Sequence, residues 1–203
     1  MEREPDLNEA LRQTAREIDA SDSDDRTLAL ALLYDLTAKR LVRLSATITR
    51  HQQDSEDAVS AALLKLAARP SLLVSADRPW HYLLRMVRNE SLVVLRSRGR
   101  WASIGRLAER LVGRNGDIVA QQDESRHIWE ALSLLPGAQR EVVVLKIWEQ
   151  MTFAEIAEVL DITPSTAASR YRYALEKLSR SLRPHFESAC EGDHRMVETG
   201  VGQ

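Results

Sequence analysis

The stretch EQMTFAEIAEVLDITPSTAASRYRYALEKL, residues 149–178, decides how the C-terminal part of the chain folds. Thr152 and Glu155 have the spacing of a capping box, in which the threonine caps a helix and the glutamate reaches back to the cap. Apolar residues then recur with the period of a helix as far as Leu160. Pro164 suits the first position of a second helix, where no amide donor is needed. The stretch therefore predicts two amphipathic helices around a tight polar turn.

The second of these helices is predicted to have a buried stripe and a polar outer face. The apolar stripe, spaced by three and four residues, is Ala168, Tyr171, Leu175, Leu178 and Leu182. The other faces carry Ser165, Thr166, Ser169, Arg170, Arg172, Tyr173 and Lys177. Short hydroxyls can approach a base edge, and arginine can reach phosphates or the acceptors of guanine. Such a helix fits the major groove as the second helix of a helix-turn-helix. The alternative is an ordinary helical hairpin whose outer face is polar.

The whole chain is predicted to be helical. No alternation of period two occurs, and aromatic residues make up only 5% of a sequence rich in Leu, Ala and Val. We expect an all-α fold with helices at residues 6–19, 26–50, 55–68, 78–98, 124–134, 138–149, 153–160 and 164–183.

A segment containing several glycines divides these helices into two groups. We predict two small helical domains joined by a linker, the C-terminal one a helix-turn-helix. The expected parts are an acidic N-terminal extension at 1–25, a helical domain at 26–100, a linker at 101–123, a second helical domain at 124–184 and a flexible tail at 185–203.

Charge is sorted into blocks along the chain, although the formal net charge is only −2. Residues 1–25 hold nine acidic and three basic residues, and residues 78–114 hold nine arginines against two glutamates. Residues 164–183 hold five basic residues against one glutamate. Two separate basic segments suggest contact with a polyanion at two places. The alternative is two solvated helix faces.

Residues 132–182 resemble region 4 of bacterial sigma factors. The motifs that carry the resemblance are Leu135-Pro136, Gln139-Arg140-Glu141, the run from Thr152 to Ala157 with Leu160, and Ser169-Arg170. The helix-turn-helix alone is shared by many response regulators, whereas the Leu-Pro and Gln-Arg-Glu run is more discriminating. Asp161 stands where the family usually has glycine, a mild departure because aspartate tolerates left-handed backbone better than most residues.

Residues 28–100 are similar to region 2 of sigma factors of the small, extracytoplasmic-function (ECF) type. The matching features are acidic residues from Asp54 to Asp57, Pro79-Trp80, Arg88-Asn89 and the basic run Arg96, Arg98 and Arg100. The resemblance implies that helix 55–68 binds the clamp helices of the largest subunit of RNA polymerase. The candidate residues are Asp54, Glu56, Asp57, Ser60, Ala61, Leu63 and Leu64. Acidic residues in a first turn also offset the helix dipole, which is a structural explanation for three of them.

The N-terminal segment departs from the family pattern in two helices. Ser60-Ala61 replace a usual Gln-Glu pair, and Leu63 replaces a usual Phe. Farther along, Val93 or Val94 replaces a usual Asp. Loss of polar contacts would weaken or alter binding to core polymerase. The sequence therefore leaves open a divergent sigma factor or a relative that has lost part of its partner surface.

The basic segment 78–100 fits a role in opening promoter DNA. Extruding a base from a duplex costs a few kcal/mol, and stacking on an aromatic side chain returns about 1–3 kcal/mol. Trp80 and Tyr82 are the candidate stacking platforms. The candidate contacts to the minus-ten element are Arg78, Arg85, Arg88, Asn89, Arg96, Arg98 and Arg100. Trp80 as an anchor of its helix to the core is the alternative.

Other function classes find little support in the sequence. His185, Cys190 and His194 lack an evident fourth ligand, so we predict no metal, no cofactor and no enzyme activity. The longest apolar run, around Leu28–Tyr34, is too short to span a bilayer. The acidic N-terminus does not resemble a signal peptide, and the single cysteine fits a reducing cytoplasm.

These observations lead to one hypothesis and two alternatives. We hypothesise an alternative, ECF-type sigma factor that binds core RNA polymerase and promoter DNA. Helix 78–100 would engage the minus-ten element, and helix 164–178 would read the minus-thirty-five element. The resemblance allows an anti-sigma factor as a further partner. The alternatives are a helix-turn-helix regulator that does not join the polymerase and a helical scaffold that does not bind DNA.

Overall fold

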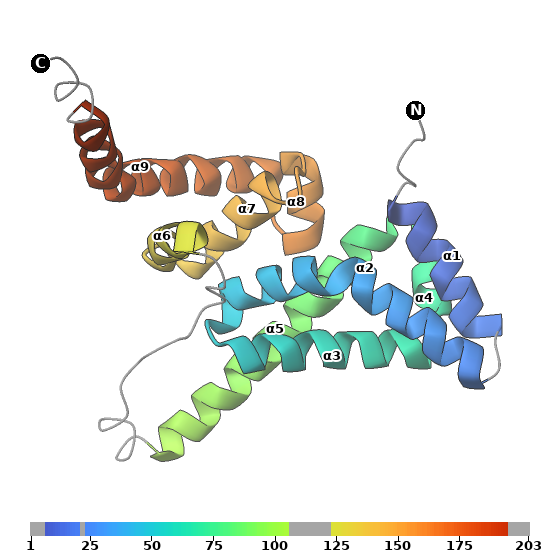
Figure 1. Cartoon of the computed structure of the whole chain (residues 1–203). Helices are drawn as coiled ribbons and strands as arrows, with labels where there is room; N and C mark the ends of the chain where they lie inside the picture. Colours follow the sequence, from blue (N-terminus) through green and yellow to red (C-terminus); the bar gives the residue numbers. More distant parts are fainter. Residues whose placement is uncertain (1–6, 21–22, 106–122, 195–203) are drawn as a thin grey trace, which may run out of the picture.

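The computed structural model describes residues 7–20, 23–105 and 123–194, which form two packed groups of helices (Figure 1). The N-terminal lobe consists of α1 (Leu7–Ala20), α2 (Ser23–Thr49), α3 (Gln52–Ala68), α4 (Ser71–Val74) and α5 (Pro79–Gly105). The C-terminal lobe consists of α6 (Asp123–Ser133), α7 (Gly137–Ile147), α8 (Phe153–Leu160) and α9 (Pro164–His194). The all-α prediction is confirmed.

Helices α4, α5 and α9 differ most from the sequence prediction, and α2 and α3 each begin three residues earlier than expected. The single turn α4 was not predicted, because four residues are too few to show a helical period. Helix α5 continues to Gly105, past the expected end at 98, and α9 continues to His194, past the expected end at 183. The predicted domain ends at 100 and 184 therefore fall inside helices. The rest of the predicted linker, 106–122, and the tail beyond His194 lie outside the described residues.

Helix α1 is part of the N-terminal lobe. Leu11, Ala15 and Ile18 are completely buried, and their spacing of four and three residues places them on one face of the helix. That face packs against α2, α4 and α5. The prediction of an extension at 1–25 separate from the first domain is therefore wrong from Leu7 onward, because the acidic residues occupy the other faces of an amphipathic helix.

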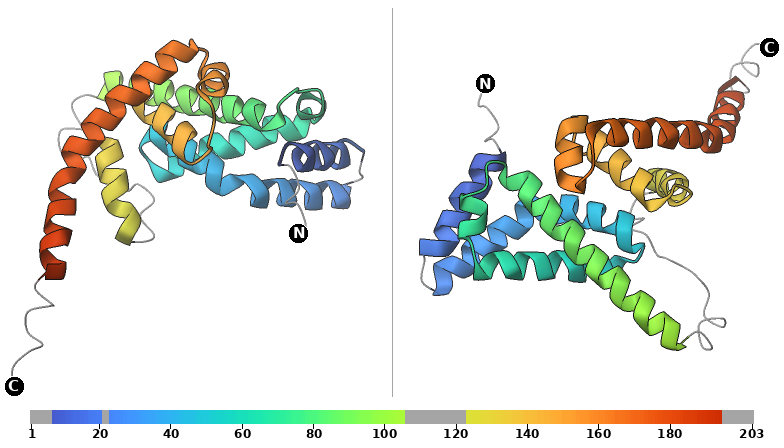
Figure 2. Two further views of the ribbon diagram at one scale, coloured as in Figure 1. Left: turned by 90° about the horizontal axis from the view of Figure 1, so that it is seen from above. Right: turned by 180° about the vertical axis from the view of Figure 1, so that it is seen from behind.

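The two lobes share a hydrophobic core. Helix α7 packs against α2, and α8 packs against α5. Val142, Met151 and Ile156 of the C-terminal lobe belong to the same buried cluster as Leu41 and Leu83 of the N-terminal lobe. Figure 2 shows α7 and α8 between α9 and the N-terminal lobe. The lobes therefore form one packed body in this arrangement.

In the part of the chain that the structure describes, every helix falls short of the apolar length that crossing a membrane requires.

Candidate nucleic-acid interface

The helix-turn-helix forms as the sequence predicts. The Glu155 amide donates to Thr152 Oγ1 at 3.3 Å, and the Thr152 amide donates to the Glu155 carboxylate at 2.8 Å, which confirms the capping box. Asp161 ends α8 in the left-handed region, with φ of 56°, as its place at the family's usual glycine requires. The Thr166 amide donates to Thr163 Oγ1 at 3.2 Å and so caps α9. These three local devices fix where α9 begins relative to α8.

The outer face of α9 presents most of the predicted residues to solvent. Ser165, Ser169, Arg172, Tyr173 and Lys177 are exposed, and Thr166 and Arg170 are half-buried. The Arg172 guanidinium lies 5.1 Å from the centroid of the Tyr173 ring. A cation and the face of an aromatic ring are thus held together on the same helix as the hydroxyl groups of its first two turns. This is a surface with donors for both phosphates and base edges.

The buried face of α9 is rotated from the predicted stripe. Ala167 and Ala174 are fully buried, whereas Leu175 is 41% exposed. Tyr171 and Leu178 are half-buried. Tyr171 packs against the buried cluster that the two lobes share and against a smaller cluster within the C-terminal lobe, and Leu178 packs against the smaller cluster. The prediction that Leu175 is buried is wrong, because two small alanines, which carry a weak hydropathy signal, let α9 approach α7 and α8 closely.

Four of the predicted minus-ten residues lie along one line. Arg78 immediately precedes α5, and Arg85, Asn89 and Arg96 follow at intervals of seven, four and seven residues. These intervals place the last three on one face of the helix. All four side chains are exposed. The side chain of Arg100 lies outside the described residues.

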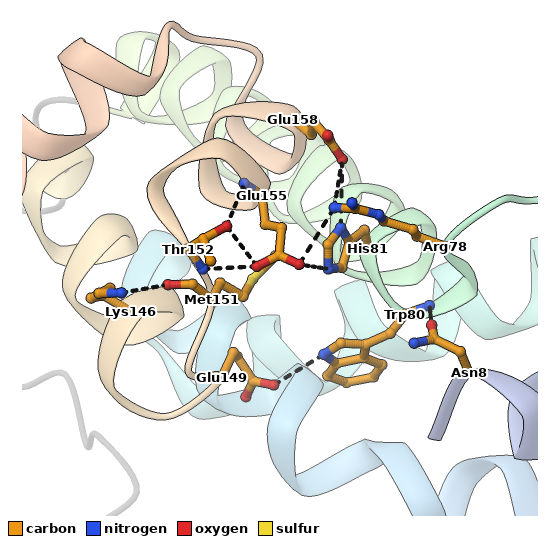
Figure 3. Close-up of polar contacts among 10 residues, drawn as sticks. All are labelled: Asn8, Arg78, Trp80, His81, Lys146, Glu149, Met151, Thr152, Glu155 and Glu158. Carbon is orange, nitrogen blue, oxygen red and sulfur yellow. Dashed lines mark hydrogen bonds and ion pairs between the residues drawn. The ribbon is translucent and has the colours of Figure 1, made fainter. Parts of the chain in front are cut away.

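Trp80 does not present a stacking face in this arrangement. It is only 5% exposed, and its amide donates to Asn8 Oδ1 at 3.0 Å. Its indole Nε1 donates to Glu149 Oε2 at 3.1 Å (Figure 3). The Arg40 guanidinium lies 4.3 Å from the ring centroid. The anchor alternative therefore describes the packed state, in which Trp80 joins α1, α2 and the segment between α7 and α8.

The remaining predicted minus-ten residues are also engaged within the protein. Arg88 Nε lies 2.6 Å from Glu141 Oε2 of α7. Arg98 Nε lies 2.8 Å from Asp54 Oδ2 of α3. Tyr82 is half-buried and packs against the hydrophobic core. In this arrangement Arg88 is therefore paired with α7 and Arg98 with α3.

The helix predicted to bind the polymerase, α3, exposes part of its candidate set. Glu56, Asp57, Ser60 and Leu64 are exposed, and Leu64 is 71% exposed, which is unusual for a large apolar side chain. Ala61 and Leu63 are half-buried. Asp54 is buried beside Arg98, so it holds α5 against α3 in this structure. The exposed surface of α3 is thus acidic at its start and apolar toward its end.

Sequence reasoning missed a set of polar contacts between the lobes. The Arg140 guanidinium donates to the carbonyls of Leu132, Leu135 and Thr47, at 2.9, 2.8 and 2.7 Å. Glu141 is the partner of Arg88. The Gln139-Arg140-Glu141 run pointed to this place in the sequence, but nothing in it indicated that two of its residues reach the other lobe.

A second part of this contact lies where the start of α8 meets the start of α5 (Figure 3). Arg78 Nη1 lies 3.4 Å from Glu155 Oε1 and 3.4 Å from Glu158 Oε2. His81 Nδ1 lies 3.7 Å from Glu158 Oε2. Glu155 belongs to the first turn of α8, where a carboxylate also interacts favourably with the helix dipole.

The environment shifts the pKa of three of these groups. Burial and, to a smaller extent, the nearby charge of Arg50 lower the pKa of Arg140 to about 10, against the opposing effect of Glu141, so the side chain stays charged at neutral pH. Burial also lowers the pKa of His81, against the opposing effect of Glu155. Hydrogen bonds from the Thr152 amide and hydroxyl lower the pKa of Glu155.

Within the described ranges, no group of three His, Cys, Asp or Glu side chains is placed to hold a metal ion. His185, Cys190 and His194 lie on the C-terminal part of α9, but their side chains lie outside the described residues.

Comparison with known proteins identifies relatives along most of the chain. The family model "Sigma-70, region 4" matches residues 125–178. The ECF RNA polymerase sigma factor SigK of Mycobacterium ulcerans is 30% identical over 186 residues, which is 89% of this chain and 95% of SigK. The RNA polymerase sigma-E factor of Streptomyces coelicolor is 27% identical over 147 residues, which is 70% of this chain and 79% of that protein.

Two solved structures share the fold. The sigma factor RpoE from Bartonella quintana, in complex with the anti-sigma factor NepR, aligns with a TM-score of 0.61 and 20% identity, over 75% of this chain and 96% of that chain. CnrH, in complex with the cytosolic domain of CnrY, aligns with a TM-score of 0.56 and 20% identity, over 86% of this chain and 98% of that chain.

Proposed function

Because the chain belongs to the family of ECF RNA polymerase sigma factors, we propose that it joins core RNA polymerase and directs initiation at promoters with a minus-ten and a minus-thirty-five element. The observation that carries this proposal is a pair of exposed cationic faces, one in each lobe. Arg85 and Arg96 lie on α5, and Arg172 and Lys177 lie on α9. Two DNA-contacting helices on one chain suit two separated promoter elements.

We assign the minus-thirty-five element to α9. Its N-terminal turn is fixed by the Thr163 cap, so its hydroxyls and arginines would enter a major groove in a defined register. We assign the minus-ten element to the line formed by Arg78, Arg85, Asn89 and Arg96. Trp80 and Arg88 join this surface only when the contacts with Glu149 and Glu141 are released.

Core polymerase is assigned to the exposed face of α3. Leu64 is an exposed apolar side chain, and Glu56 and Asp57 provide negative charge nearby. An exposed apolar residue with a charged rim is typical of a surface that binds another protein. Ser60-Ala61 remain the place where binding is expected to differ from the family. RNA polymerase acts in the cytoplasm, so we propose that this protein acts in the cytoplasm as well.

A regulator that binds DNA without joining the polymerase is less favoured. The alignment with SigK extends over 89% of this chain and so includes the N-terminal lobe, which a helix-turn-helix regulator would not need. Because RpoE and CnrH were solved with NepR and the cytosolic domain of CnrY, we include an anti-sigma factor among the proposed partners.

The test is transcription by core RNA polymerase on genomic DNA fragments with and without the purified protein. We expect the protein to copurify with core enzyme and to direct specific transcript starts. Strong binding to duplex DNA without any binding to core enzyme would support the regulator.

The variant for α9 is Arg170→Ala with Arg172→Ala. We expect weaker binding to duplex DNA. In a plot of the logarithm of the binding constant against the logarithm of the salt concentration, the slope should become shallower by about one for each lost phosphate contact. The matched control, Arg16→Ala with Lys39→Ala, removes two exposed cations from α1 and α2 and should leave both quantities unchanged. If the α9 variant also leaves both unchanged, the scaffold alternative is favoured.

A further inference from the structure

The first half of α2 carries a row of exposed leucines that the proposed function does not use. Leu28 is 63% exposed, Leu32 is 47% exposed and Leu36 is 46% exposed. Successive members are four residues apart, so the three side chains lie beside one another on one face of the helix. Single exposed leucines are ordinary in folded proteins, but a contiguous apolar row is typical of a surface that binds another protein. We call these three residues the leucine row.

The leucine row lies away from the recognition helix α9. Figures 1 and 2 show the start of α2 at the opposite end of the molecule from α9. A partner that covers the leucine row would therefore leave the polar outer face of α9 open to DNA.

Two opposite charges flank the leucine row at equal distances. Asp25 precedes Leu32 by seven residues, and Lys39 follows it by seven. Seven residues are close to two full turns, so both side chains lie on the same face as the row, about 10 Å on either side of Leu32. Both side chains are exposed, and within the described residues neither of them forms an ion pair.

This pattern of charges and leucines is complementary to itself in a reversed copy. Two α2 helices related by a two-fold axis near Leu32 run antiparallel, and Leu28 of each copy then meets Leu36 of the other. Asp25 of each copy meets Lys39 of the other. A parallel pair would instead bring like charges together at both ends of the row, which electrostatic repulsion opposes.

We propose that the leucine row joins two copies of this chain in an antiparallel dimer with two-fold symmetry. The apolar contact supplies the affinity, and the two exposed ion pairs mainly set the direction of the helices. Neither DNA nor polymerase takes part in this contact, so the proposed dimer does not depend on the proposed function.

The dimer is expected to be weak. Three leucines from each copy form a small interface, so the dissociation constant should be on the order of tens of micromolar. At nanomolar concentrations the chain is then a monomer, and DNA binding measured under those conditions reports the monomer.

The test measures self-association of the full chain by analytical ultracentrifugation at micromolar concentrations. We expect a monomer–dimer equilibrium for the parent chain. Leu32→Lys removes one leucine from each copy and brings two like charges together at the two-fold axis, so dimerisation should weaken at least about tenfold. The control is Leu175→Lys, the same substitution at a leucine of α9 that is 41% exposed, and it should dimerise as the parent does. A monomeric parent chain, or a Leu32→Lys variant that dimerises as tightly as the parent, overturns the inference.

A charge exchange tests the direction of the helices. In the Asp25→Lys variant, the introduced lysine faces Lys39 of the second copy, so dimerisation at low salt should weaken about tenfold. The double variant Asp25→Lys with Lys39→Asp restores opposite charges only in an antiparallel pair, and it should dimerise as the parent does. A double variant as weak as the single one overturns the inference. Both positions are exposed, so this comparison still decides if Leu32→Lys fails to fold, as judged by circular dichroism.

Core polymerase is the other partner that the test must distinguish. The Arg26 guanidinium donates to the Ala67 carbonyl, so the start of α2 lies beside the end of α3, the helix assigned to the polymerase. We expect Leu32→Lys at nanomolar concentration to bind immobilised core polymerase as tightly as the parent. Weaker binding to core polymerase together with unchanged self-association would assign the leucine row to the polymerase and overturn the inference.

Discussion

At the scale of single residues, Arg140 holds the junction of the lobes. The residue is 4% exposed, and its guanidinium donates to the Leu132 carbonyl at the end of α6, to the Leu135 carbonyl in the turn that follows and to the Thr47 carbonyl in α2. Guanidinium has five donors in a rigid planar fork, so one side chain can satisfy three carbonyls that would otherwise be buried without a partner. The resulting hydrogen bonds fix the α6–α7 turn and join it to the N-terminal lobe.

We predict that Arg140→Lys lowers the free energy of unfolding by roughly 2–4 kcal/mol, because an ammonium group cannot reach all three carbonyls and leaves at least one unsatisfied. Urea denaturation followed by circular dichroism measures this. Arg172→Lys, at an exposed position of α9, is the control and should change stability by less than about 0.5 kcal/mol. Equal effects at both positions would show that the buried hydrogen bonds do not matter.

His81 should make stability depend on pH. Its pKa in the folded protein lies below the ordinary value of 6.5, chiefly because of burial; Glu155 and Glu158 oppose this shift, and Arg78 adds to it. Below pH 6.5 the unfolded chain therefore takes up a proton that the folded chain resists, and the free energy of unfolding falls as the pH falls through this range. In urea denaturations on both sides of pH 6.5, His81→Gln should reduce the fall. A fall of the same size in that variant would assign it to other groups.

At the scale of elements, the start of α8 has two roles. Its capping box sets the geometry of the helix-turn-helix, and Glu155 of the same box faces Arg78 and His81 of the other lobe. Thr152 holds the carboxylate by two hydrogen bonds, both of 2.8 Å. The capping box that starts α8 thus also holds Glu155 in position for its contact with the N-terminal lobe.

We predict that Thr152→Ala destabilises the protein by about 1 kcal/mol at neutral pH, whereas Thr152→Ser retains the cap and most of the stability. The hydrogen bonds from Thr152 hold the pKa of Glu155 below its ordinary value of 4.5, so this contribution is present above that value and is lost as the pH falls through the folded pKa. The difference between parent and Thr152→Ala should therefore shrink in acid. Urea midpoints at neutral and acidic pH check this, and a constant difference contradicts it.

At the scale of the whole molecule, the lobes share apolar contacts as well as charges. Met151 and Ile156 of the C-terminal lobe lie in one buried cluster with Leu41 and Leu83 of the N-terminal lobe. Separation of the lobes would expose part of this cluster to water. A partner can therefore separate the lobes only by binding the separated state more tightly than the packed one.

We predict that the free chain unfolds in a single transition, because the largest buried cluster contains residues of both lobes. Circular dichroism, which reports on all helices, and tryptophan fluorescence, to which Trp80, Trp129 and Trp148 contribute, should give coincident urea curves. In the Glu141→Gln, Glu149→Gln variant the two curves should separate. Separate transitions in the parent chain would show that the lobes fold independently.

The local features of the chain were determined by the sequence alone. The capping box at Thr152, the turn at Asp161 and the start of α9 at Pro164 each depend on neighbours within a few residues, so spacing was enough to predict them. The helical class followed from periodicity in the same way. The resemblance to sigma factors also depended on short motifs, and the SigK relative confirmed it.

Only the tertiary structure decided what those residues face. Trp80, Arg88 and Asp54 were predicted to contact partners, yet each contacts another part of its own chain. Glu149, which carried no prediction, is the carboxylate that encloses Trp80. The physical reason is sequence separation: a helix period tells which residues share a face, but which distant face covers it depends on packing between elements that have no fixed spacing along the chain.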